Sequence, residues 1–191
     1  MPDLMQILLN TGSLVPSLIT TLRVLAGVMS IWLVGGGIFE LYAVSNDNNQ
    51  RLLSGRKEFT WAGGLGSLLI GGLMMGFTNL EVIAPLTNGF TGGYVTSQLM
   101  MYQVDGAASL TEKGKAALSV IFMILQAVGF IAFLKAFWVF NNRFNNGPSN
   151  QISMGLAFGY LIGGFLCWNA KWVIDVAGNQ FGFNILGLFF N

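Results

Sequence analysis

The sequence predicts an all-α membrane protein with about four transmembrane helices, arranged as two tandem helical hairpins of the same orientation. Hydrophobic residues make up 53% of the 191 residues and charged residues only 9%, whereas a soluble domain carries about 25% charged residues. Four segments are apolar over close to the ~20 residues that a helix needs to cross a hydrocarbon core. Part of the sequence also repeats at a fixed offset.

The four predicted spans differ in length and in the polar residues that they carry. The first, residues 18–43, has Arg23 near its start and Glu40 near its end. The second, residues 61–77, is short and rich in glycine. The third, residues 116–140, contains Gln126 and Lys135, and the fourth covers residues 152–173. The predicted segments are an interfacial N-terminal segment (1–17), a first hairpin (18–77), an extracytoplasmic loop (78–115), a second hairpin (116–173) and an apolar C-terminal segment (174–191).

The distribution of basic residues predicts the orientation. Short loops rich in Lys and Arg stay on the cytoplasmic side. The loop after the first span carries Arg51, Arg56 and Lys57, and the loop after the third carries Arg143. We therefore expect these two loops in the cytoplasm, with both termini and the long second loop on the opposite side.

An internal repeat supports the two hairpins. At an offset of 92 residues, Val28 matches Val120, and the sequence LIGG occurs at both 69–72 and 161–164. Such a period constrains the whole fold. Two spans in each copy give the copies the same orientation, unlike the inverted repeats of many transporters. The other matches are Leu33/Leu125, Gly37/Gly129, Asn49/Asn141, Arg51/Arg143, Gly55/Gly147 and Gly63/Gly155.

Small residues at helical spacing predict close contacts between helices. Residues four apart lie on one helix face, and small side chains let helices approach closely in lipid, where no hydrophobic force drives them together. These faces pack either within the chain or against another subunit. The predicted packing residues are Gly63, Ser67 and Gly71 with Gly72 and Gly76 on a neighbouring stripe of the second span, and Gly155, Gly159 and Gly163 in the fourth.

Charged residues inside the spans are candidate functional residues because a charge in lipid is costly. Glu40 and Lys135 lie near the cytoplasmic ends of the first and third spans. We expect either an intramembrane ion pair between them or separate extension of each side chain to the interface. The two alternatives have equal support from the sequence.

A second polar group is expected at the outer face. Lys171 and Asp175 are four apart and share a helix face, and Arg23 lies at the same predicted membrane depth. Trp168 and Trp172 flank them as interface anchors. The alternative is ordinary anchoring at the end of a helix.

The composition argues against catalysis. The chain contains no histidine and one cysteine, Cys167, so Ser–His–Asp and Cys–His sites are impossible and no Cys/His cluster exists to bind a metal. A net charge of +1 provides no field for nucleic-acid binding. We expect no catalytic residue, cofactor or metal, and no direct contact with nucleic acid.

Several of these features together resemble a known family. They are the apolar N-terminal segment, the glycine-rich LIGG span, and LQAVGFIAFLKAFWVFNN leading to GLAFGYLIGGFLCWNAKWV. The chain resembles the IcmC/DotE group of small inner-membrane proteins in Dot/Icm (type IVB) secretion systems, with the related DotV and TraQ-type conjugation proteins. Gly129 and the Gly163–Gly164 ending before Asn169 carry most of the resemblance, which extends over residues 5–175.

The resemblance implies a non-catalytic subunit of a secretion or conjugation apparatus in a bacterial inner membrane. Its partners would be the lipid bilayer and other secretion-system membrane subunits. The alternative is a homo-oligomeric channel, holin-like pore or transporter. Polar residues along one helix would favour that alternative, and the spans contain only scattered ones.

Overall fold

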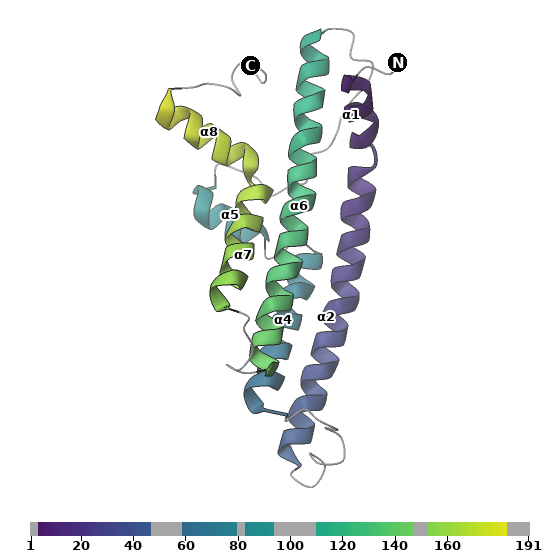
Figure 1. Ribbon diagram of the computed structural model, residues 1–191, viewed down its shortest axis with the longest axis vertical. Helices are drawn as coiled ribbons and strands as arrows, with labels where there is room; N and C mark the ends of the chain where they lie inside the picture. Colours follow the sequence, from purple (N-terminus) through teal and green to yellow (C-terminus); the bar gives the residue numbers. More distant parts are fainter. Residues whose placement is uncertain (1–3, 47–58, 80–82, 94–109, 147–152, 183–191) are drawn as a thin grey trace. The chain divides into compact units, whose positions relative to one another are not determined.

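The all-α class is confirmed by a computed structural model, which describes residues 4–46, 59–79, 83–93, 110–146 and 153–182 (Figure 1). These residues are almost entirely helical, and they form no strand. The helices in chain order are α1 (Leu4–Gly12), α2 (Val15–Ser45), α4 (Trp61–Thr78), α5 (Ile83–Thr91), α6 (Leu110–Asn146), α7 (Met154–Trp168) and α8 (Ala170–Phe181).

Three helical segments among the described residues are long and apolar enough to cross a membrane: Asn10–Ser45, Trp61–Thr78 and Gly114–Asn145. They correspond to the first three predicted spans. The second prediction, residues 61–77, is within one residue of α4, whereas α2 and α6 are longer than predicted.

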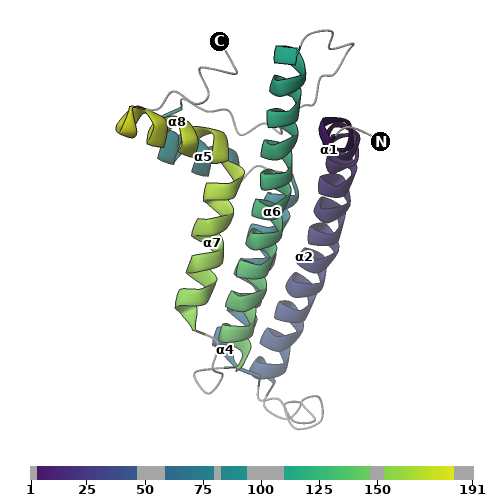
Figure 2. The same cartoon turned by 45° about the horizontal axis from the view of Figure 1, so that its top comes forward.

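The fourth predicted span, residues 152–173, is not one helix. Its apolar part is α7, whose 15 residues extend about 22 Å, short of the ~30 Å hydrocarbon core. The helix is interrupted at Asn169, whose backbone has φ −100° and ψ 29°. The chain then turns into α8, which leaves at an angle to α7 (Figure 2).

Local sequence signals set the helix starts. Pro16 lies in the first turn of α2, where its missing N–H removes no helical hydrogen bond. Thr60 is the N-cap of α4, and its hydroxyl accepts a hydrogen bond from the backbone N–H of Gly63 at 3.0 Å. This cap satisfies one of the backbone donors that a helix start leaves open.

The predicted extracytoplasmic loop (78–115) contains helical structure at both ends, namely α5 and the first turns of α6. Residues 94–109 lie outside the described residues, as do Arg51, Arg56 and Lys57 and the C-terminal residues 183–191. The predictions made for them are therefore not examined by the structure.

The chain divides into two compact units. The first contains Met1–Leu22, Ile83–Ile131 and Gly163–Asn191, and the second contains Arg23–Val82 and Ala132–Ile162. In the first unit, Val15, Ile19, Met123 and Ala127 form a buried apolar cluster. In the second unit, the ring of Phe77 on α4 lies 4.9 Å from that of Phe133 and 5.0 Å from that of Phe137, both on α6.

Candidate functional site

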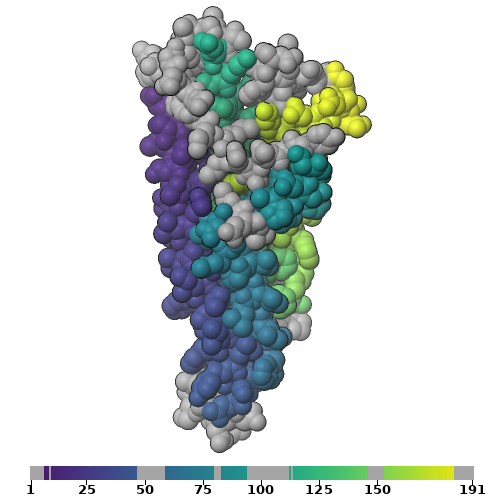
Figure 3. Space-filling model, turned by 180° about the vertical axis from the view of Figure 1, so that it is seen from behind, coloured from purple at the N-terminus to yellow at the C-terminus, as the bar shows by residue number. Residues whose placement is uncertain are grey.

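Glycines hold α2 against α4 in the second unit. A Cβ atom on Gly37 would lie 2.8 Å from the carbonyl oxygen of Gly64 and 3.0 Å from the amide nitrogen of Leu68. One on Gly71 would lie 3.0 Å from the amide nitrogen of Val34. Gly37 pairs with Gly64, whereas the earlier residue Val34 pairs with the later residue Gly71, so the two helices are antiparallel. Helix α4 lies directly against α2 (Figure 3).

The same kind of contact joins α6 to α7 in the first unit. A Cβ atom on Gly129 would lie 2.7 Å from the carbonyl oxygen of Gly164 and 2.9 Å from the amide nitrogen of Trp168. The two contacts have the same form. In each unit, a glycine of the longer helix lies against a glycine carbonyl of the shorter helix and against the backbone amide of the residue four positions after that glycine. Such contacts need glycine because any side chain would meet backbone rather than a movable side chain.

The 92-residue repeat aligns the glycines of the two longer helices but does not align their partners on the two shorter helices. Gly37 and Gly129 are 92 residues apart, as the sequence match requires, but their partners Gly64 and Gly164 are 100 residues apart. The difference of eight residues is about two helical turns. Within LIGG, Gly72 aligns with Gly164, yet a Cβ atom on Gly72 would meet nothing within 4 Å.

The predicted packing residues separate into two groups. Gly63, Ser67 and Gly71 are buried on α4, whereas Gly76 is half-buried. Gly72, Gly159 and Gly163 have open space where a Cβ would stand, and Gly155 meets only the hydroxyl of Ser153, at 3.2 Å. Within this chain, α7 therefore packs on α6 through Gly164 and Trp168, and its predicted glycine stripe faces away from that contact.

A buried polar cluster joins α4 to the end of α6. The hydroxyl of Ser67 donates to Oδ1 of Asn141 at 2.9 Å. The amide of Asn145 donates to the same oxygen at 3.0 Å and to the Ser67 hydroxyl at 3.1 Å. Ser67 and Asn141 are buried. The sequence-based prediction placed both asparagines in a loop, although Asn141 was among the repeat matches.

Gly63 leaves the space that this cluster needs at the start of α4. A Cβ atom there would lie 2.8 Å from Oδ1 of Asn145, 3.0 Å from Oε2 of Glu40 and 3.1 Å from the Thr60 hydroxyl. The side chain of Glu40 is almost fully buried, with 8% of the residue exposed. Because Gly63 has no side chain, oxygen atoms of Asn145, Glu40 and Thr60 can all lie next to it. A larger residue at this position would displace at least one of them.

Glu40 and Lys135, the two residues of the predicted intramembrane pair, each have a described neighbour. Glu40 lies beside Gly63, whereas the Lys135 ammonium lies over the ring of Tyr160 on α7, 5.4 Å from its centroid. Lys135 is on the exposed side of α6. The two side chains therefore lie beside different residues, and the intramembrane pair stays a prediction.

The three residues of the predicted outer cluster belong to different units. Arg23, in the second unit, donates from Nε to the backbone oxygen of Thr78 at 2.6 Å. Thr78 is the last residue of α4, so the guanidinium satisfies a terminal carbonyl and meets the negative end of the helix dipole. Lys171 and Asp175 lie one turn apart on α8, in the first unit.

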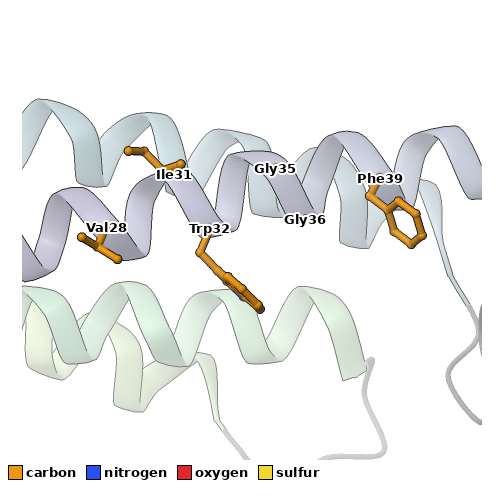
Figure 4. Close-up of a pocket in the computed structure, with 6 residues that line it drawn as sticks. All are labelled: Val28, Ile31, Trp32, Gly35, Gly36 and Phe39. Carbon is orange, nitrogen blue, oxygen red and sulfur yellow. The ribbon is translucent and has the colours of Figure 1, made fainter.

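One face of α2 is open and entirely apolar. Val28, Ile31, Trp32, Gly35, Gly36 and Phe39 line a shallow pocket of about 550 Å³ (Figure 4). Trp32 is 79% exposed, and Cβ atoms on Gly35 and Gly36 would meet nothing within 4 Å. Sequence reasoning missed this face because its two glycines, Gly35 and Gly36, are adjacent and do not recur at a four-residue interval.

The close contacts described above join helices to one another. The described residues contain no group of three or more His, Cys, Asp or Glu side chains that could hold a metal ion. The buried hydroxyls of Ser30 and Ser67 donate hydrogen bonds to neighbouring helices, to the Gly71 carbonyl and to Asn141. No protein-family model matches this chain, and no curated protein or solved structure matches it.

Proposed function

We propose that this chain is a non-catalytic integral membrane subunit that binds other membrane proteins through exposed helix faces. The observation that carries the proposal is the open face of α2, where Trp32 and Phe39 flank the unoccupied notch at Gly35 and Gly36. Small residues next to large apolar ones let a second transmembrane helix approach and interlock.

The uneven burial of the spans supports the same proposal. Only 28% of the most apolar window of the first span is buried, compared with 44% for α4 and for α6. The glycines Gly159 and Gly163 of α7 add a second open face. In contrast, Ser67 and Asn141 are buried and joined to each other by a hydrogen bond, an arrangement that holds helices together rather than lining a path for ions.

The type IVB secretion or conjugation apparatus is the proposed setting, and it rests on the resemblance described above. In that setting the chain lies in the bacterial inner membrane with both termini in the periplasm and contributes to assembling the translocation channel. The two-hairpin arrangement is part of the proposal: α2 pairs with α4, and α6 pairs with α7, through close glycine contacts.

The test is purification in a mild detergent followed by identification of the proteins that co-purify. Parallel preparations carry Gly36→Leu, which fills the α2 notch, or Gly72→Leu, which fills an equally open position on α4. We expect secretion-system membrane subunits to co-purify with the parent and with Gly72→Leu and to be lost with Gly36→Leu.

Two results would overturn the proposal. One is recovery as a homo-oligomer that conducts ions in liposomes, which would favour the channel. The other is co-purification that is insensitive to Gly36→Leu, which would remove the α2 face from the interface.

A further inference from the structure

Helix α8 has two chemically distinct sides. Lys171, Asp175 and Asn179 follow one another at intervals of four and share one face. Trp172, Val173, Val176 and Phe181 lie around the rest of the helix, where Gln180 is the only polar exception. A helix with one charged stripe and a broad apolar side is typical of segments that lie in the plane of a membrane surface.

The apolar side of α8 is open over its C-terminal half, whereas Trp172, Val173 and Ile174 are half-buried. None of the residues of α8 is buried, and the exposed fractions of Val176 and Phe181 reach 41% and 75%. The helix also has a defined end, since Gly182 adopts a left-handed conformation with φ 73° and closes it with a hydrogen bond to the Gly178 carbonyl. Helix α8 is thus a discrete element whose apolar side is only partly covered.

Its neighbour along the chain indicates what covers that surface. Only Asn169 separates α8 from α7, and α7 contains no charged residue. The first charges after this apolar helix are Lys171 and Asp175, both on α8. The uncharged helix α7 is therefore followed directly by α8, where charge first appears, and this change from apolar to charged residues is typical of a membrane interface.

We infer that α8 lies along the lipid–water interface, with Val173, Val176 and Phe181 in the lipid and Lys171, Asp175 and Asn179 in the water. The bilayer is its binding partner. Trp172, at the edge of the apolar side, is suited to the headgroup region. This inference depends on membrane insertion and on no protein partner, so it can fail or succeed separately from the proposed assembly role.

Single-cysteine labelling in proteoliposomes tests the inference. Cys167 is the only cysteine of the chain, so Cys167→Ala provides the background, with Cys167→Ser as a second background if the first is unstable. Asp175→Cys and Val176→Cys form one matched pair, and Asn179→Cys and Phe181→Cys the other. All four positions are exposed in the structure, so protein burial alone predicts equal labelling.

A water-soluble maleimide is supplied on both sides of the bilayer, which makes the result independent of orientation. We expect the cysteines at 175 and 179 to react about tenfold faster than those at 176 and 181, because the apolar side of such a helix lies below the headgroups. A fluorophore attached at 176 should be quenched by lipids that carry a nitroxide on the acyl chain.

Three results would overturn the inference. Equal and fast labelling at all four positions would place α8 in water. Protection of all four would place α8 in the hydrocarbon core as a continuation of α7. Protection at 176 and 181 without quenching by nitroxide lipids would mean that protein rather than lipid covers the apolar side.

Discussion

The three adjacent glycines of α2 allow a closely matched test of helix packing. Gly37 faces α4, where an added Cβ atom would lie 2.8 Å from the Gly64 carbonyl oxygen, whereas Gly36 faces open space. Alanine at either position adds the same methyl group to the same helix. The difference in stability between Gly37→Ala and Gly36→Ala therefore isolates the contact with α4.

The size of the difference follows from the distances. Carbon and carbonyl oxygen normally approach to about 3.3–3.6 Å, so the helices must separate by roughly half an ångström at this point. Over-packing of this kind costs about 1–3 kcal/mol. Both variants share the gain of about 0.5–1 kcal/mol from replacing glycine within a helix. We expect Gly36→Ala to be slightly stabilised and Gly37→Ala to be less stable than it by about 1–3 kcal/mol.

The assay is reversible unfolding in mixed micelles, titrated with sodium dodecyl sulfate and followed by helicity and tryptophan fluorescence. Gly129→Ala extends the test to the first unit, where the corresponding distance is 2.7 Å. Equal stabilities of the variants at 36 and 37 would refute the reasoning, because the two helices would then not be in backbone contact at Gly37.

Three further predictions use the same unfolding assay or the co-purification assay. Asn141→Leu removes one buried and one part-buried hydrogen bond and should cost about 1–2 kcal/mol. Asn142→Leu, at a half-buried neighbour, should cost less, and equal losses would argue against the cluster. Arg23→Leu should cost about 1.5–3 kcal/mol because the Thr78 carbonyl loses a charged donor, and Arg23→Lys should recover part of it; no recovery would exclude a charge effect. Gly36→Leu should abolish partner binding without lowering the unfolding midpoint, since an added Cβ atom at this position meets nothing within 4 Å; a lowered midpoint would contradict this.

The apolar pattern predicts the helical class and the position of α4 because long uncharged runs and glycine content are properties of the sequence alone. It does not predict the end of α7. Apolar residues continue past Asn169 into α8, and hydropathy averaged over a window cannot separate a straight span from two helices joined by one non-helical residue. The predicted single span 152–173 is therefore wrong in its C-terminal part.

The contacts were less predictable than the helices. Four-residue spacing of glycines shows that a face can approach a neighbour closely, but adjacent stripes of one helix can compete for that role. On α7 the contact uses Gly164 and leaves Gly163, its immediate neighbour, open. Likewise Asn141 and Asn145 follow the apolar run that ends at Phe140, where a loop is the usual expectation. The extra turns of α6 bring them onto Ser67.

The most direct test of the account is photo-crosslinking from the open face of α2 in intact membranes. A photoreactive phenylalanine analogue replaces Trp32, which is 79% exposed, and in a matched control it replaces Leu69 of α4, which is 70% exposed. The account predicts a discrete protein adduct from position 32, with a secretion-system membrane subunit as the partner, and only lipid adducts from position 69. Lipid adducts alone from both positions would contradict the claim that α2 binds another membrane protein.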